Sequence, residues 1–273
     1  MNNPLRKICV SPPYFAFKKI YRYENILIAP VVPEQPLEDE IGKIAITEAG
    51  RHLAILGSCL FAMDEQEKFY YLACKAVMKS FPAPNFCDKN NKIFLLVRNV
   101  SNLKDKFAVY GVILDGDQVI YDLYVEYKKM SPKVFKRLFN NFKLDYKTQI
   151  DSPYKRFFAK FENLKIDQNS LSATIPSIGS ENCSGHFEEY PMMPVAISAY
   201  IISKAAGLLY KKIKSKNQYK ITGLDLSVFG AISPCLEWQI IANYNQLGNY
   251  FECFLGSSPE QQEVMIKLKI SNE

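Results

Sequence analysis

A predicted apolar helix begins directly after the stretch Gly185-His186-Phe187-Glu188-Glu189-Tyr190-Pro191-Met192-Met193-Pro194. The stretch places one of the chain's two histidines on the loop before that helix, and its prolines restrict how the chain enters the helix. Histidine can gain or lose a proton near neutral pH, so His186 is a candidate for moving a substrate proton. The other histidine, His52, lies on a second apolar helix, one turn after Glu48. The two histidines occupy comparable places, so the two halves of the chain can be compared.

Two segments of the chain begin alike and continue alike. The first opens with Ser11-Pro12-Pro13-Tyr14 and the second with Ser152-Pro153-Tyr154. Each leads through alternating apolar residues to a proline, then to a loop and a long helix, at 41–63 in the first half and 194–214 in the second. Apolar residues cover most sides of both helices, which is typical of buried helices. The repeat predicts an internal duplication with one buried helix in each half.

A run of predicted strands follows each helix. These strands lie at 69–74, 93–97, 107–113 and 119–127 in the first half, and at 219–229, 236–244, 250–255 and 264–270 in the second. Their aromatic and β-branched residues, and turns such as Asp115-Gly116-Asp117, favour antiparallel hairpins. An antiparallel sheet wrapped round one long central helix is the hot-dog fold, of the α+β class. We therefore predict a double hot-dog, with fused units at 1–140 and 141–273 and a short helix at 132–139 before the second unit.

Composition indicates a globular protein with a large core. Of the 273 residues, 48% are hydrophobic and 23% are charged, a balance typical of soluble domains. No apolar run reaches the roughly 20 residues of a membrane span, and the N-terminus lacks the apolar stretch of a secretory signal. The seven cysteines are scattered, which argues against a disulfide scaffold or a zinc ribbon. Two histidines in different segments make a histidine metal site poorly supported. We expect a cytoplasmic protein without a metal.

The formal charge of +6 is mild but clustered. The basic clusters are Lys133, Lys136 and Arg137 in one place and Lys211, Lys212 and Lys214 in another. They are either solvated helix ends, where cations are favourable, or a docking surface for an acidic partner. No nucleic-acid-binding motif accompanies the charge, so a nucleic-acid partner is not expected.

Three short patterns around the second helix resemble a known enzyme family. They are Gly185-His186-Phe187, then Pro191-x-Met193-Pro194, then Ala205-Ala206-Gly207. Their order is similar to that in the 3-hydroxyacyl-[acyl carrier protein] dehydratases of bacterial fatty acid synthesis, the FabA/FabZ type. The resemblance implies hot-dog units, no cofactor, and an acyl thioester substrate carried on acyl carrier protein or coenzyme A.

The chain departs from the family pattern at four positions. Tyr200 stands where the family has an acidic residue, and Lys204 where it often has glutamine. Glu188 replaces a proline, and Val195 replaces a glycine. Taken alone, the second half would therefore lack its acid.

The first half supplies what the second half lacks. Its helix carries Thr47-Glu48-Ala49-Gly50-Arg51-His52, which is similar to the family's acid-bearing helix. In the family, each site joins the histidine of one unit to the acid of the other. The resemblance therefore implies one composite site in which His186 meets Glu48.

Dehydration of a 3-hydroxyacyl thioester to a trans-2-enoyl thioester, or the reverse hydration, needs both a base and an acid. The resemblance makes His186 the base and Glu48 the acid, and burial of Glu48 on an apolar helix is expected to raise its pKa. Supporting roles fall to His52, Gly185, Phe187 and Val195, and an acyl tunnel is expected along Pro191, Met193, Pro194 and Tyr200.

Other interpretations stay open. A hot-dog thioesterase would use a carboxylate such as Glu48 to direct water at the thioester, and a non-catalytic protein would only hold an acyl group or a partner. His186 could cap a backbone group, Glu48 could bond a buried tyrosine, and His52 could be a core histidine. A fused pair could stay a monomer or form a homodimer.

Overall fold

The computed structural model describes residues 7–82, 92–101, 106–145, 151–187 and 189–272. The altered motif position Glu188 lies outside these residues. The first half contains β1 (Tyr21–Tyr23), β2 (Ile26–Val31), α1 (Ile46–Ala62), β3 (Tyr70–Ser80), β4 (Ile93–Asn99), β5 (Phe107–Asp115), β6 (Gln118–Met130) and α2 (Pro132–Leu138). The second contains β7 (Glu162–Ile166), β8 (Ser170–Ile175), α3 (Val195–Lys214), β9 (Lys220–Val228), β10 (Trp238–Asn245), β11 (Tyr250–Gly256) and β12 (Gln262–Ser271). Three short 3-10 helices lie at Asn140–Phe142, Pro153–Arg156 and Ser180–Cys183.

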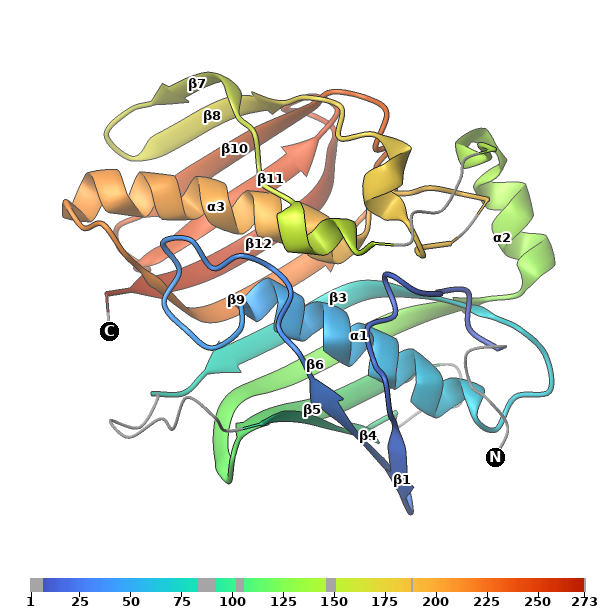
Figure 1. Ribbon diagram of the computed structural model, residues 1–273. Coiled ribbons are helices and arrows are strands. Elements are labelled where there is room, and N and C mark those ends of the chain that lie inside the picture. The colour runs from blue at the N-terminus through green and yellow to red at the C-terminus, as the bar shows by residue number, and fades with distance from the viewer. Residues whose placement is uncertain (1–6, 83–91, 102–105, 146–150, 188, 273) are drawn as a thin grey trace.

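All the strands of the described residues form one antiparallel sheet, in the order β1-β2-β4-β5-β6-β3-β9-β12-β11-β10-β8-β7. The order of the second half mirrors that of the first about the β3–β9 boundary. There the two halves meet in a direct ladder, from Lys75 opposite Ser227 to Lys79 opposite Gly223. The strands of the two halves therefore follow the same order outward from this boundary, and each half wraps round its own long helix (Figure 1).

The two long helices are buried because almost every side is apolar. Leu53 and Leu56 of α1, and Ile201 and Ile202 of α3, are fully shielded from solvent. Gly111 on β5 lets α1 approach the sheet, because a Cβ there would lie 2.5 Å from Leu53 and 2.7 Å from the Leu96 carbonyl oxygen. α1 and α3 contact each other across the junction of the halves (Figure 1).

Each loop that precedes a long helix reaches into the opposite half. In the first loop, Ile41 N–H donates to the Tyr219 carbonyl at 2.7 Å, and Lys204 Nζ donates to the Leu37 carbonyl at 2.7 Å. In the second loop, the Gly185 carbonyl accepts from Ser11 N–H at 2.8 Å. These crossed loops bring residues from both halves to the ends of the helices.

The helices predicted at 132–139 and 194–214 agree with α2 and α3 to within one residue, whereas α1 begins at Ile46, five residues after the predicted start at 41. The strands are longer than predicted at several ends. In the described part of the chain, no helix has both the length and the apolar character needed to cross a membrane.

Candidate active site

A cavity of about 240 Å³ lies between the first turn of α3 and one side of α1. α1 contributes Thr47, Gly50, Arg51, Ala54, Ile55 and Ser58, a spacing that keeps all six on one stripe of the helix. α3 contributes Val195, Ala196, Ser198 and Ala199. Residues of β3 and β9 line it on the sheet side, and the loop from His186 to Met193 contributes four more residues. Most of this lining is apolar, which suits an acyl chain.

The loop that carries His186 is held by the N-terminal segment of the chain. His186 forms an isolated antiparallel bridge with Val10. Gly185 has a φ of 83°, and a Cβ there would clash with the backbone of Ser11 and Tyr14, so the close approach requires glycine. The imidazole contacts two rings: its centroid lies 4.8 Å from that of Tyr14 and 4.0 Å from that of Phe187. The N-terminal segment was not predicted to take part in the site.

The imidazole of His186 is neutral at physiological pH. Burial lowers the pKa of His186 to about 4, although the contact with the Met192 carbonyl raises it in part. Nδ1 lies 3.1 Å from that carbonyl oxygen, so the neutral ring carries its proton on Nδ1 and donates it there. Nε2 is then the unprotonated nitrogen, and within the described residues Nδ1 makes the ring's only hydrogen bond. His186 therefore has the state that a general base needs.

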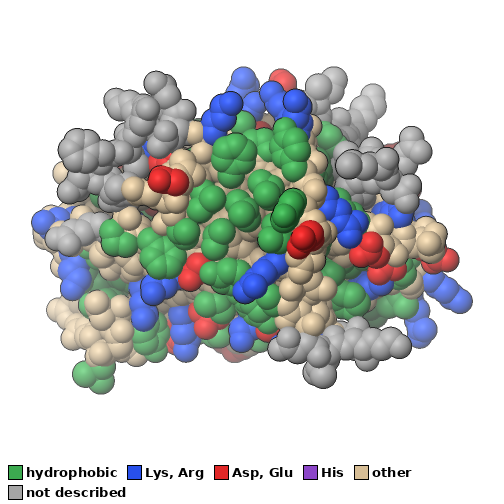
Figure 2. Space-filling model, turned by 90° about the horizontal axis from the view of Figure 1, so that it is seen from below, with side chains coloured by type: hydrophobic (Ala, Val, Ile, Leu, Met, Phe, Trp, Pro, Cys, Tyr) green, Lys and Arg blue, Asp and Glu red, His purple; other side chains and the backbone are tan. Residues whose placement is uncertain are grey.

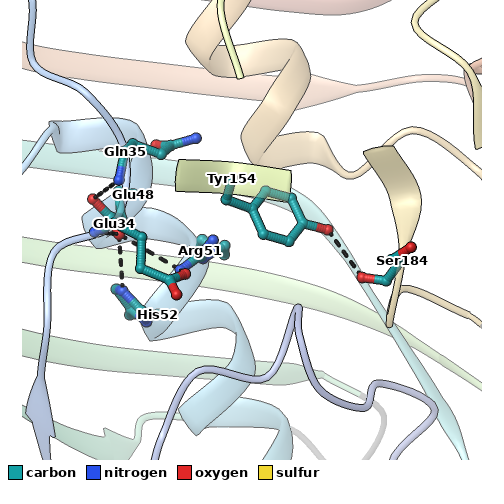
Figure 3. A network of polar contacts seen from close by, with 7 residues as sticks. All are labelled: Glu34, Gln35, Glu48, Arg51, His52, Tyr154 and Ser184. Carbon is teal, nitrogen blue, oxygen red and sulfur yellow. Dashed lines mark hydrogen bonds and ion pairs between the residues drawn. The ribbon is translucent and has the colours of Figure 1, made fainter. Parts of the chain in front are cut away.

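Glu48 lies in a buried polar network on another side of α1 (Figure 3). Its carboxylate accepts from Glu34 N–H at 2.7 Å and from Gln35 N–H at 3.1 Å. Arg51 Nη2 and His52 Nε2 each lie 3.5 Å from Glu48 Oε1. Burial acts to raise the pKa of the Glu48 carboxyl, but His52, Arg51 and the Glu34 N–H together lower it below its ordinary value. The expectation that burial would raise this pKa is therefore wrong.

His186 and Glu48 are not in the same wall. His186 lines the cavity, and Glu48 is not among the lining residues. Tyr14 and Arg51 connect them: the Arg51 guanidinium lies 5.8 Å from the Tyr14 ring centroid and contacts Glu48. The predicted pairing of these two residues in catalysis stays a prediction.

The other predicted site residues divide between the cavity and the core. Phe187, Met193 and Val195 line the cavity, whereas Gly185, Pro191, Pro194, Tyr200 and His52 do not. His52 is 1% exposed, with its ring 5.3 Å from that of Phe17. Burial and then Arg51 lower the pKa of His52, so it is neutral. Tyr200 is equally buried, and burial raises its pKa.

Sequence reasoning missed four polar residues of the cavity wall. Thr47 Oγ1, Ser198 Oγ, Tyr71 Oη, and Nε and Nη1 of Arg51 are buried and have no hydrogen-bond partner among the described residues. Buried polar groups are normally bonded, so unpaired groups beside one cavity are typical of a site that receives a polar ligand or water. Arg51 is also fully buried, with Tyr154 4.7 Å from its guanidinium. The sequence could have indicated Arg51 as a site residue, because it is a charged residue inside an otherwise apolar helix.

The two basic clusters differ in their relation to the cavity. Lys133, Lys136 and Arg137 are exposed on α2, and Phe139, directly after α2, lines the cavity together with Lys128. The second cluster lies at the other end of α3 from the residues that line the cavity. There Lys211 forms an ion pair with Asp39, and Lys212 donates to the Ile166 carbonyl. Only the first cluster is next to the cavity.

No protein-family model matches the sequence, and no curated protein matches it. Among solved structures, an acyl-ACP thioesterase from Bacteroides thetaiotaomicron VPI-5482 is similar with a TM-score of 0.57 at 11% identity, covering 90% of this chain and 98% of that one. The 12:0-ACP thioesterase from Umbellularia californica has a TM-score of 0.58 at 6% identity, with coverage of 90% and 94%.

A conserved protein of unknown function with a hot dog fold, from Alicyclobacillus acidocaldarius, has a TM-score of 0.51 at 8% identity. The match covers 96% of this chain and 98% of that one. At such low identities the likeness shows the fold and not the activity. Together with the antiparallel sheet wrapped round long helices, it establishes that this chain has the hot-dog fold.

Proposed function

We propose that the protein hydrolyses acyl thioesters, with the acyl chain in the cavity between α1 and α3. The observation that carries this proposal is His186, a neutral imidazole in the wall of an apolar cavity with Nε2 available to accept a proton. The names of two similar structures, both acyl-ACP thioesterases, support the same substrate class. The proposal therefore departs from dehydration, the reaction that the motif resemblance implies.

In the proposed reaction, Nε2 of His186 takes a proton from a water molecule as the water oxygen attacks the thioester carbonyl carbon. The carbon–sulfur bond then breaks, and the departing thiolate takes the proton back from the imidazolium. The products are a fatty acid and the free thiol of the carrier. Negative charge that develops beside the ring favours the protonated imidazole, so the basicity of His186 rises during the attack.

The carbonyl oxygen needs hydrogen-bond donors as it becomes negative. The first N–H groups of α3 belong to Val195 and Ala196, both of which line the cavity, and no side chain caps this helix start. N–H groups in a first helical turn have no partner inside the helix and favour negative charge. The buried guanidinium of Arg51 adds a positive charge to the same cavity.

Dehydration of a 3-hydroxyacyl thioester is the second candidate. It is favoured by the Gly185-His186-Phe187 loop, which places a base beside the cavity as the resemblance implies. It also needs an acid at the substrate, and Glu48 lies outside the lining with a lowered pKa. Hydrolysis needs only a base, water and an oxyanion site, and it therefore fits the geometry better.

The architecture that we propose is a double hot-dog with units at 1–140 and 141–273 and one composite site. It is supported by the mirrored strand order on the two sides of the β3–β9 boundary. It is also supported by the cavity, to which α1 of the first unit and His186 of the second both contribute.

We further propose that the carrier docks beside α2. Lys133, Lys136 and Arg137 form a positive surface next to Phe139 of the cavity wall. A carrier with acidic side chains or phosphate groups is attracted to such a surface.

The test is incubation of the purified protein with acyl thioesters on acyl carrier protein and on coenzyme A, including 3-hydroxyacyl forms. Hydrolysis releases free thiol, whereas dehydration lowers the substrate mass by one water and releases none. We expect thiol release that His186→Ala lowers by roughly 10²-fold to 10⁴-fold, the usual contribution of a general base. Loss of water without thiol release would show that the protein is a dehydratase and would contradict the proposed hydrolysis. Binding of the thioester with neither change would show that the protein is not catalytic.

A further inference from the structure

The sheet of the first half is apolar on both faces. Along β4, β5 and β6, alternate side chains such as Leu95, Val109 and Leu123 point toward α1 and are at most 1% exposed. The side chains between them point to the other face, where burial is only partial. The apolar residues of this outer face are Val77, Phe94, Leu96, Tyr110, Val112, Leu114, Val119 and Tyr124. We call them the outer patch.

The strand register makes the outer patch continuous. Leu96 lies opposite Val112, and Tyr110 lies opposite Tyr124, which lies opposite Val77. Viewed from below the orientation of Figure 1, hydrophobic side chains gather in the middle of the molecular surface, with charged side chains around them (Figure 2).

The corresponding face of the second half is different. Its outward residues are mainly polar: Ser172, Thr174, Gln239, Asn243, Glu252, Lys267 and Lys269. Only one row, Ile241 opposite Phe254 opposite Met265, is apolar. The two halves share their strand order, so the fold does not itself require an apolar outer face. The outer patch is therefore a property of the first half and not of the fold, and contact with a partner surface is one use of such a face.

Charges of both signs surround the outer patch. Asp122 lies opposite both Val112 and Lys79 in the register, and Glu126 accepts from the Tyr124 hydroxyl at 2.8 Å. On the opposite side, the Arg98 guanidinium lies 5.6 Å from the Tyr110 ring centroid. A surface with an apolar centre and a rim of mixed charge can complement a second copy of itself, as a two-fold interface requires. A partner surface with charges of a single sign would repel the rim residues that carry the same sign.

We propose that the outer patch is the interface of a two-fold homodimer, in which the sheets of two first halves stack face to face. Four strands about 4.8 Å apart, with about five residues each, give a patch of roughly 300 Å² in projection. Each partner in a stable interface buries about 800 Å². The charged rim must therefore be buried with the apolar centre, and its mixed signs allow each cation to meet an anion of the other copy.

Analytical ultracentrifugation of the full chain tests the proposal. The wild-type protein should sediment as a dimer, at twice the 31.3 kDa chain mass. Val112→Glu places a second carboxylate beside Asp122 in the patch and should raise the dimer dissociation constant at least 100-fold. Ile241→Glu is the matched control, because it makes the same change on the outward face of the second half, and it should stay dimeric.

Circular dichroism shows whether each variant is folded. If the Val112→Glu variant is unfolded, Val77→Lys is tested in its place. Val77 is already 41% exposed, so a charge there should not disturb the fold. A wild-type protein that is monomeric at about 100 µM would overturn the proposal and leave the patch to another protein or a membrane surface. A dimer whose dissociation constant changes with neither Val112→Glu nor Val77→Lys would place the interface elsewhere. Neither result depends on thioester hydrolysis.

Discussion

The ring centroid of Tyr14 lies 4.8 Å from that of the His186 imidazole, although the two residues come from different halves of the chain. The Tyr14 ring also contacts Tyr154 edge-on, with centroids 5.4 Å apart, and both tyrosines lie near the guanidinium of Arg51. The tyrosines of the two segments that begin the halves, Ser11-Pro12-Pro13-Tyr14 and Ser152-Pro153-Tyr154, thus lie near one arginine. The candidate base depends on this convergence for its position.

Replacing Tyr14 should disturb the position of His186 without removing it. We expect Tyr14→Ala to lower kcat for thioester hydrolysis by roughly 10-fold to 100-fold, because small displacements of a catalytic group are costly. KM should change less, since Tyr14 is only one of many residues that line the cavity and the others remain. Steady-state kinetics with one acyl thioester measure both constants.

Tyr14→Phe is the control, because it keeps the ring and removes only the hydroxyl. Its kcat should stay within a few-fold of wild type. Equal losses in both variants would mean that the hydroxyl acts in the reaction and that ring packing is not the reason.

The low pKa of His186 should make the protein sensitive to acid. The folded-state pKa of about 4 lies below the ordinary value of 6.5. Between these values the unfolded chain binds a proton that the folded chain does not, so the free energy of unfolding falls as pH falls from 6.5 toward 4. Above pH 6.5 the ring is neutral in both states and has no such effect.

His186→Gln removes this titration. Relative to that variant, wild type should lose about 2 kcal/mol of unfolding free energy between pH 7 and pH 5. Urea denaturation at the two pH values gives the comparison. Equal losses in the two proteins would mean that His186 is not desolvated in solution.

Glu48→Gln should mainly affect stability. The substitution removes the 3.5 Å contact of Arg51 with Glu48 and leaves the buried Arg51 with Glu34 as its remaining carboxylate partner, at 2.6 Å. Because Arg51 is still paired, we expect a loss of about 1–3 kcal/mol, less than the cost of leaving a buried charge alone. Because the folded-state pKa of Glu48 is lowered, the carboxylate stabilises the fold above its ordinary pKa of 4.5 and this contribution is lost as pH falls. Thermal unfolding of wild type and variant at pH 7 measures the difference.

The same variant separates structure from catalysis. If Glu48→Gln keeps the wild-type unfolding temperature but abolishes turnover, Glu48 acts in the reaction. Both a dehydratase and a thioesterase that uses this carboxylate to direct water predict that result, and the product of the wild-type protein then distinguishes them. Thr47→Val, one residue earlier on the same helix, removes a hydroxyl from the cavity wall and provides a comparison in which the buried ion pair is intact.

Charge reversal on α2 should weaken the use of carrier-bound substrates only. We expect the triple change Lys133→Glu, Lys136→Glu and Arg137→Glu to raise KM for acyl-[acyl carrier protein] roughly 10-fold, because the electrostatic attraction is lost. kcat should not change, and neither should kcat/KM for an acyl thioester of a small neutral thiol. The control is Lys212→Glu with Lys214→Glu on α3, away from the cavity, which should leave KM unchanged.

Sequence patterns predicted the helices well, because apolar periodicity is a local property. The helix predicted at 194–214 is α3, Val195–Lys214, and that predicted at 132–139 is α2, Pro132–Leu138. The mirrored order of the strands was implied by duplication. The pairing of β3 with β9 could not be deduced from a local pattern, because the two strands come from different halves of the chain.

The candidate site was predictable only where a short motif carried it. His186 was identified from its glycine and proline neighbours, and it does line the cavity. The environment of Glu48 was only partly predictable. An apolar helix indicates that Glu48 is buried, but the sequence does not show that N–H groups of the preceding loop, at Glu34 and Gln35, bind its carboxylate, or that such contacts lower its pKa. Tyr14 was missed for the same reason: its contact with His186 exists only in the folded chain.

The β3–β9 ladder fuses two sheets through main-chain hydrogen bonds, so neither half has a free edge at that boundary. A half produced on its own would expose β3 or β9 as an unpaired strand, and such edges recruit other chains. Covalent linkage ensures that the correct edge is always the nearest one. The two halves can therefore differ in what they supply to the cavity, to which the second half contributes His186 and the first contributes Arg51.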